Sequence, residues 1–288
     1  MSEVKPNRRA GVVGLGLIGG SFARAWKAAG WSVLAFDTDP ETLEAAGVET
    51  IEGVLDEKAI ASCDIIVLAA YPKACVGWLC EHAEMLGDLG EACPVIIDAA
   101  GTKRQICQKA FPLAERHGFP FCGTHPMAGT EKTGFANSRQ DLFLGAPMVL
   151  VPPTLSDEDR LELLDRVHEL LEPIGFGSYS VSTPEEHDRT IAFTSQLAHV
   201  VSNAYIKSPT ARAHRGFSAG SYKDLTRVAR LNAPMWRELM LENSENLQRE
   251  IDALIAHLGQ YQDVLIRHDG EALEALLAEG DRIKRALD

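Results

Sequence analysis

The stretch Gly14-Leu-Gly-Leu-Ile-Gly19 decides the fold of this chain of 288 residues. It follows an apolar run at 10–13, typical of a buried strand, and leads into a helical pattern at 21–29. Gly14 permits a tight turn there, Gly16 lets the backbone approach a pyrophosphate, and Gly19 lets the helix pack closely on the strand. The helix N-terminus offers unpaired N–H groups and a positive dipole end to phosphates. The residues predicted to bind a dinucleotide here are Gly14, Gly16, Leu17, Ile18 and Gly19.

Short apolar runs alternate with helical patterns through the first part of the chain. Strands are predicted at 32–36, 64–69, 94–98, 147–151 and 177–181, with helices between them, among them 157–171. Strands that are apolar throughout are buried on both faces, as in a parallel sheet between two helix layers. The sequence therefore predicts an α/β, doubly wound, Rossmann-type domain over residues 1–182.

The character of the sequence changes at residue 183. Helices are predicted at 185–207, 222–230, 234–257 and 271–287. We expect residues 183–288 to form an all-α domain that binds substrate and dimerises. The apolar periodicity at 235–265 exceeds what one small helical domain needs to bury, so the expected partner is a second copy of the chain.

Asp37 ends the second predicted strand, near the offset at which a carboxylate binds the adenosine ribose in dinucleotide folds. A carboxylate at this position would repel a 2′-phosphate, so the sequence predicts NAD rather than NADP. The alternative is that Asp37 caps the next turn, and the nearby Asp39 leaves that choice open.

Composition excludes several classes of partner. The net charge of −13 argues against nucleic acid, and no apolar run approaches the ~20 residues of a membrane helix. The polar, basic start of the chain is unlike a secretory signal, so we expect a cytoplasmic protein. None of the six cysteines forms a Cys-x-x-Cys pair, which favours buried, reduced thiols over a zinc site. No metal is expected.

A second signature is Gly123-Thr-His-Pro-Met-Ala-Gly-Thr-Glu131, after a short predicted strand at 119–122. A histidine suits a general base at neutral pH, because its ordinary pKa is ~6.5. A histidine after a strand is more often structural. The glycine and proline beside His125 would hold it on a fixed loop, which favours a catalytic role.

With these two signatures, and three later segments in the same order, the chain resembles the prephenate/arogenate dehydrogenase family. The later segments are His187-Asp188, Ser195-Gln-Leu-Ala-His199, and Gly220-Ser-Tyr-Lys-Asp224-Leu-Thr-Arg227, the last followed by Met235-Trp236. The chain departs from the family pattern at two positions. Gly101 stands where the family has a serine that helps to orient the catalytic histidine, and Gln196 replaces a histidine.

The resemblance implies a reaction and a set of roles. The expected reaction is the NAD-dependent oxidative decarboxylation of prephenate to 4-hydroxyphenylpyruvate, in tyrosine biosynthesis. His125 would be the base. Thr102, which follows Gly101, would supply a hydroxyl in place of the family serine. The residues expected to bind the substrate are His187, His199, Gly220, Arg227, Trp236, Glu131 and Asp224. Arginine suits a carboxylate because its planar fork donates two parallel hydrogen bonds.

Other functions remain open at this point. Arogenate differs from prephenate by an amino group in place of the side-chain keto group, and the sequence does not separate the two. A β-hydroxyacid dehydrogenase and a non-catalytic NAD-binding sensor are further alternatives.

Overall fold

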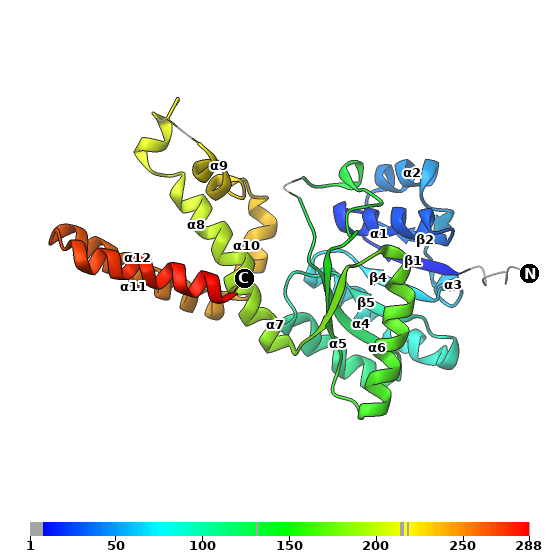
Figure 1. Cartoon of the computed structure of the whole chain (residues 1–288). Coiled ribbons are helices and arrows are strands. Elements are labelled where there is room, and N and C mark those ends of the chain that lie inside the picture. Colours follow the sequence, from blue (N-terminus) through cyan, green and yellow to red (C-terminus); the bar gives the residue numbers. More distant parts are fainter. Residues whose placement is uncertain (1–7, 131, 214–215, 218, 288) are drawn as a thin grey trace, which may run out of the picture. The chain divides into compact units, whose positions relative to one another are not determined.

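The computed structural model describes residues 8–130, 132–213, 216–217 and 219–287 (Figure 1). It divides into two compact units. The first contains the chain up to Ile191 together with Arg230–Glu242, and the second contains Ala192–Ala229 and the chain from Asn243 onward. This division differs from the predicted boundary at residue 182, because α7 (Pro184–Ile191) and α10 (Ala233–Glu242) belong to the first unit.

Among the described residues, eight strands form one sheet in the order β3-β2-β1-β4-β5-β6-β7-β8. Neighbouring strands are parallel except for the antiparallel pair β6 and β7. The strands are β1 Arg9–Val13, β2 Ser32–Phe36, β3 Gly53–Val54, β4 Ile65–Leu68, β5 Val95–Asp98, β6 Phe121–Pro126, β7 Pro147–Val151 and β8 Ser178–Val181. The predicted α/β class is confirmed, whereas the antiparallel pair was not predicted.

Helices cover both faces of the sheet (Figure 1). They are α1 Leu17–Ala28, α2 Pro40–Glu49, α3 Glu57–Ile60, α4 Pro72–Asp88, α5 Arg104–His117 and α6 Asp157–Leu171. Along β1, Val12 packs in one apolar cluster with α1 and α6, while Val13 packs in a second with α4 and α5. Because successive strand residues point to opposite faces, strands that are apolar throughout are buried between two helix layers.

The helices of the C-terminal half differ from the prediction in their bounds. The predicted helix at 185–207 is α7, a π-helical segment Ala192–Leu197 and α8 Ala198–Tyr205. The predicted single helix at 234–257 is wrong: α10 ends at Glu242, and α11 is Ser244–Ile266. The remaining helices are α9 Gly220–Thr226 and α12 Gly270–Leu287.

α10 and α11 are separated at Asn243, which has φ −115° and ψ 24° and a buried side chain. Its amide nitrogen donates to Gln196 Oε1 at 3.0 Å, and its oxygen accepts from Asn246 Nδ2 at 2.8 Å. Gln196 stands where the family has a histidine, and this contact gives it a structural role. In the described part of the chain, no helix is both long and apolar enough to cross a membrane.

A buried ion pair joins three elements at the carboxyl end of β5. Asp98 and Lys103 are both 0% exposed, and Lys103 Nζ donates to the Asp98 carboxylate and to the Thr124 carbonyl. The carboxylate also accepts the N–H groups of Ala100 at 2.9 Å and Thr124 at 3.1 Å. The pair therefore connects the end of β5, which carries Asp98, with the start of α5, which follows Lys103, and with Thr124 in β6.

We expect Lys103→Met to lower the free energy of unfolding by about 3–5 kcal/mol, because it leaves the Asp98 charge buried without its partner. Urea denaturation of the two proteins measures this difference. The double variant Lys103→Met/Asp98→Asn is the control, and it should recover part of the loss since no buried charge remains. A loss below about 1 kcal/mol in the single variant would show that the pair does not organise this edge of the sheet.

Candidate active site

The glycine loop lies at the point where the strand order reverses, between β1 and β4. Gly14 has φ +92°, and a side chain there would meet the carbonyl oxygen of Ala69 at 2.9 Å. A side chain at Gly19 would overlap the Gly14 carbonyl, at 1.8 Å. A Cβ at Gly16 would meet no atom within 4 Å, so the backbone of the loop is open to a pyrophosphate at this residue. Gly14 and Gly19 leave no room for a side chain in this turn, and the binding of a pyrophosphate at Gly16 stays a prediction.

Asp37 lies against this loop. Its Oδ2 accepts the N–H of Leu15 at 2.6 Å, and its Oδ1 accepts the N–H of Asp39 at 2.9 Å. Asp39 is the residue that caps α2, since it accepts from Glu41 N at 3.2 Å and Thr42 Oγ1 at 2.6 Å. The carboxylate that follows β2 is thus held at the glycine loop.

His125 belongs to strand β6, not to the loop that the sequence suggested. It pairs with Val149 of the antiparallel strand β7, which extends β6 as far as Pro126. The strand carries the half-buried side chain toward the carboxyl end of the sheet, the same edge at which Gly14 follows β1. The backbone of the candidate base is therefore held by two strands rather than by loop residues.

The imidazole of His125 begins a chain of hydrogen bonds that runs into the protein. His125 Nδ1 and His187 Nε2 are 2.9 Å apart, and His187 Nδ1 lies 2.8 Å from Asp188 Oδ1. Asp188 also accepts the backbone N–H groups of Lys103 at 2.7 Å and Arg104 at 3.0 Å. His187 is 3% exposed, and both of its ring nitrogens are hydrogen-bonded within the protein. The structure therefore does not place it where it was expected, in contact with substrate.

These contacts determine which nitrogen carries each proton. An ionised carboxylate only accepts, so His187 Nδ1–H donates to Asp188. In a neutral His187 the Nε2 atom then has the lone pair, and His125 Nδ1–H must donate to it. The remaining lone pair of His125 is on Nε2, which makes that atom the proton acceptor.

Burial and neighbouring cations keep the two histidines neutral. Burial lowers the pKa of His125 well below its ordinary value, and the charged forms of His187 and Lys103 lower it further. Burial also lowers the pKa of His187, although the hydrogen bond to Asp188 partly offsets this. Burial would raise the pKa of Asp188, but bonds from His187, Arg104 and Lys103 hold that pKa below its ordinary value. The charge states required by the hydrogen-bond chain therefore prevail at neutral pH.

Thr102 does not contact His125. Its buried hydroxyl donates instead to Glu242 Oε2 on α10 at 2.6 Å. Gly101, at the family's serine position, faces Leu239, whose Cδ1 would lie 3.4 Å from an added Cβ. Thr102 therefore does not take the role of the family serine as expected, because the Thr102 hydroxyl is directed to α10. Trp236, also on α10, is half-buried.

In the second unit, side chains of α8 hold the turn that carries Arg227. His199 Nδ1–H donates to the Val228 carbonyl at 3.0 Å, and Ser202 Oγ donates to the Leu225 carbonyl at 2.7 Å. Asn203 Nδ2 donates to the Ala229 carbonyl at 3.1 Å. Carbonyls at and after a helix end need such partners, so α8 determines the backbone on which the exposed Arg227 lies.

The other predicted substrate residues are less informative. Gly220 and Asp224 are exposed on α9 in the second unit. Glu131 lies outside the residues that the structure describes. Asp98, Lys103 and Asp188 were not predicted as site residues. Their signal in the sequence is a pair of opposite charges that flank the end of an apolar strand, and an aspartate next to His187.

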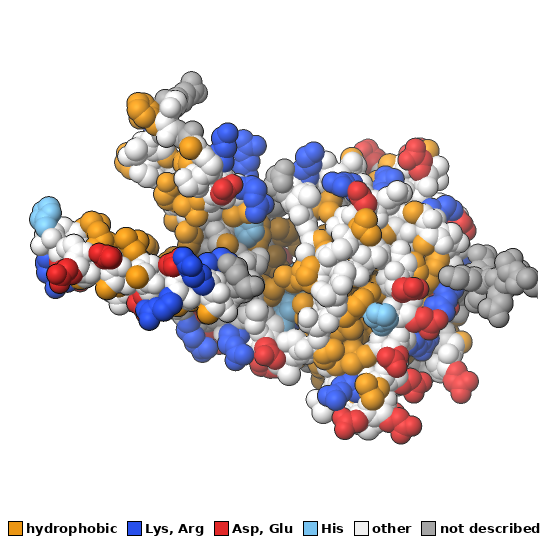
Figure 2. Space-filling model, in the orientation of Figure 1, with side chains coloured by type: hydrophobic (Ala, Val, Ile, Leu, Met, Phe, Trp, Pro, Cys, Tyr) orange, Lys and Arg blue, Asp and Glu red, His pale blue; other side chains and the backbone are white. Residues whose placement is uncertain are grey.

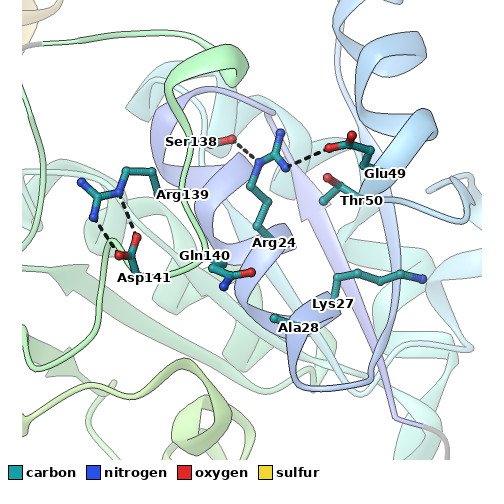
Figure 3. A pocket seen from close by; sticks show the side chains of 9 residues that line it. All are labelled: Arg24, Lys27, Ala28, Glu49, Thr50, Ser138, Arg139, Gln140 and Asp141. Atoms are coloured by element: carbon teal, nitrogen blue, oxygen red, sulfur yellow. Dashed lines mark hydrogen bonds and ion pairs between the residues drawn. The ribbon is translucent and has the colours of Figure 1, made fainter.

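An open hollow of about 510 Å³ lies elsewhere on the first unit, beside α1 (Figure 3). Its cations are paired: Arg24 with Ser138 and Glu49, and Arg139 with Asp141. None of the described site residues lines it. The lining residues are Arg24, Lys27, Ala28, Glu49, Thr50, Ser138, Arg139, Gln140 and Asp141.

Two family models match consecutive parts of the chain. The nucleotide-binding domain of prephenate dehydrogenase matches residues 22–176, and its dimerization domain matches residues 183–279. This chain belongs to the prephenate dehydrogenase family. The resemblance inferred from the sequence is thereby confirmed.

Individual relatives agree with the family. A prephenate dehydrogenase of Lactococcus lactis is 28% identical over 96% of this chain and 77% of its own length. The structure of A. aeolicus prephenate dehydrogenase in complex with hydroxyphenyl propionate and NAD+ is 27% identical, with a TM-score of 0.79 over 99% of this chain and 100% of that one. Synechocystis arogenate dehydrogenase is 27% identical, with a TM-score of 0.74 over 96% of this chain and 99% of that one.

The lowered pKa of His125 gives a prediction for the free protein. We expect the ring to titrate with a midpoint below ~6.5, so that it is neutral at pH 7 and protonates only as the pH falls through that lowered value. The pH dependence of its Cε1–H signal in NMR measures the midpoint, and His125→Asn identifies the signal. A midpoint at or above 6.5 would mean that burial and Lys103 do not act on this ring.

Proposed function

We propose that the protein catalyses the NAD-dependent oxidative decarboxylation of prephenate to 4-hydroxyphenylpyruvate, with release of CO2 and NADH. The observation that carries the proposal is the hydrogen-bond chain that leaves the lone pair of His125 on Nε2. Membership of the family and the open space beside Gly16 support it.

The nucleotide residues favour NAD. Bound NAD would supply the acceptor for the hydride that leaves the ring carbon bearing the hydroxyl. Gly14, Gly16, Leu17, Ile18 and Gly19 would hold its pyrophosphate at the start of α1. Asp37 would accept hydrogen bonds from the ribose hydroxyls and repel a 2′-phosphate, and Asp39 adds a second negative charge nearby.

His125 performs the proton transfer in this proposal. Its Nε2 accepts the proton of the substrate's ring hydroxyl as the hydride departs, while the ring carboxylate leaves as CO2 and the ring becomes aromatic. A positioned general base contributes typically ~10²–10⁴-fold to the rate. A neutral imidazole suits this step, since a protonated ring could not accept.

By resemblance to the family, further residues would bind the substrate. Arg227 is the candidate for a two-bond contact, because the guanidinium matches a carboxylate in shape. His199 is a second donor, and its ring is oriented by the bond to the Val228 carbonyl. Trp236 would contribute an apolar surface for the ring. The family resemblance also predicts contacts with the substrate for three further residues, Gly220, Glu131 and Asp224.

Arogenate is the second candidate substrate. The two solved relatives named for prephenate and for arogenate are each 27% identical to this chain, so similarity favours neither. The reaction at the ring is the same for both substrates, and the same base would serve.

We infer that the chain works as a homodimer in the cytoplasm. The match to a dimerization domain and the exposed apolar side chains of α11 and α12 support a second copy as the partner. Figure 2 shows hydrophobic side chains along these helices. The large apolar side chains that are exposed on them include Ile255, Leu258, Leu265, Leu277 and Ile283. Free, mostly buried cysteines suit a reducing compartment. Light scattering at micromolar concentration tests the dimer, and a monomer would contradict it.

Initial rates of NADH formation test the function. Prephenate and arogenate are each assayed with NAD and with NADP. We expect turnover with prephenate and NAD, and weak or no turnover with NADP. Binding of NAD without turnover of either substrate would refute the proposal and favour an NAD-binding sensor or a β-hydroxyacid dehydrogenase.

Two variants separate chemistry from binding in the same assay. His125→Asn should lower kcat by ~10²-fold or more with little change in KM, because the base is lost and a polar contact remains. Arg227→Ala should mainly raise KM, since ground and transition states share the carboxylate contact. Near-normal turnover of His125→Asn would remove His125 from the chemistry.

A further inference from the structure

The candidate base is oriented by a partner from a different element. Gly101 has no side chain, and the hydroxyl of Thr102 donates to Glu242, so this loop offers His125 no hydroxyl. Among the described residues, the partner of His125 Nδ1 is His187 Nε2, at 2.9 Å. His187 comes from α7, which packs against α5 in the first unit.

We propose that His187 and Asp188 are the positioning residues of the base, and that they hold His125 in the tautomer whose Nε2 accepts the substrate proton. The inference rests on the proposed function for its role in catalysis, but the tautomer itself is a property of the free protein. Neither residue touches the reacting atoms: Asp188 acts on His187, and His187 acts on His125.

Asp188 is able to direct this chain because its own position is determined by the backbone. One of its oxygens accepts from Lys103 N and from His187, and the other accepts from Arg104 N. Both N–H groups lie at the start of α5, where helix donors have no intrahelical partner. A carboxylate held by two backbone donors has one orientation, so the proton on His187 is directed to Nδ1.

Charges around the two rings support the neutral state of the pair. Asp188 and Asp98 are the anions near His187, and Lys103 is the buried cation that acts on both rings. Arg104 Nε lies 3.6 Å from Asp188 Oδ2, which further stabilises the carboxylate. When His125 takes a proton on Nε2, its Nδ1–H remains bonded to His187. The His187 ring then lies between the positive charge on His125 and the Asp188 carboxylate.

A matched pair of variants at His187 tests the proposal. In His187→Gln the side-chain amide reaches the position of Nε2, so it can still accept from His125, although it cannot reach Asp188. In His187→Asn the amide takes the position of Nδ1, so it keeps the Asp188 contact and loses His125. We expect His187→Asn to lower kcat by ~10²-fold with KM nearly unchanged, and His187→Gln to stay within ~10-fold of the parent protein.

A purely structural role gives the opposite order, because His187→Asn preserves the buried contact with Asp188. The acid limb of kcat/KM against pH is a second readout, since only a partner of His125 should move it. Equal losses in the two variants with unchanged acid limbs would overturn the proposal.

A measurement without substrate separates this proposal from the proposed function. The ¹⁵N shifts of labelled histidine in the free protein report which nitrogen carries hydrogen. We expect hydrogen on Nδ1 of His125 and on Nδ1 of His187 at pH 7.5. Hydrogen on Nε2 of His125 would overturn the positioning role, whether or not the protein turns over prephenate. The expected tautomers in a protein without activity would contradict only the reaction.

Discussion

Asp98 and Lys103 are both completely buried, and the arrangement of the candidate site depends on the contacts that this requires. A buried charge is tolerated only when it is paired and its remaining hydrogen-bonding groups are satisfied. Asp98 meets this condition through Lys103 and the N–H groups of Ala100 and Thr124. Thr124 immediately precedes His125, so satisfying the carboxylate also places the strand that carries the base.

The same lysine connects the strand to the histidine chain. Its side chain binds Asp98 and the Thr124 carbonyl, while its backbone N–H binds Asp188. One residue thus links the backbone of His125 to the carboxylate that directs its proton. The lysine charge also opposes protonation of both histidines, which keeps the base in its accepting form. Position, tautomer and charge state of the base consequently share one set of buried contacts.

Much of the fold could be predicted from the sequence, because local patterns determine it. Continuous apolar runs between glycine-rich turns give the strands, and the predictions at 147–151 and 157–171 match β7 and α6. The buried contact between Asn243 and Gln196 could not be predicted, since the two residues are far apart in sequence. The placement of His125 in a strand likewise depends on pairing with Val149. The sequence singles out His125 as the candidate base, but its partner could not be predicted, because His187 is 62 residues away and reaches it only in the folded protein.

Native-state hydrogen exchange tests most directly the claim that a rigid buried network holds the base before substrate binds. The amides of Thr124, Lys103 and Arg104 donate to Asp98 or Asp188 and report on each part of the network. The account predicts that all three exchange only by unfolding of the first unit, with the same free energy and the same denaturant dependence. Rapid exchange of these amides by local opening, while the central strands remain protected, would contradict it.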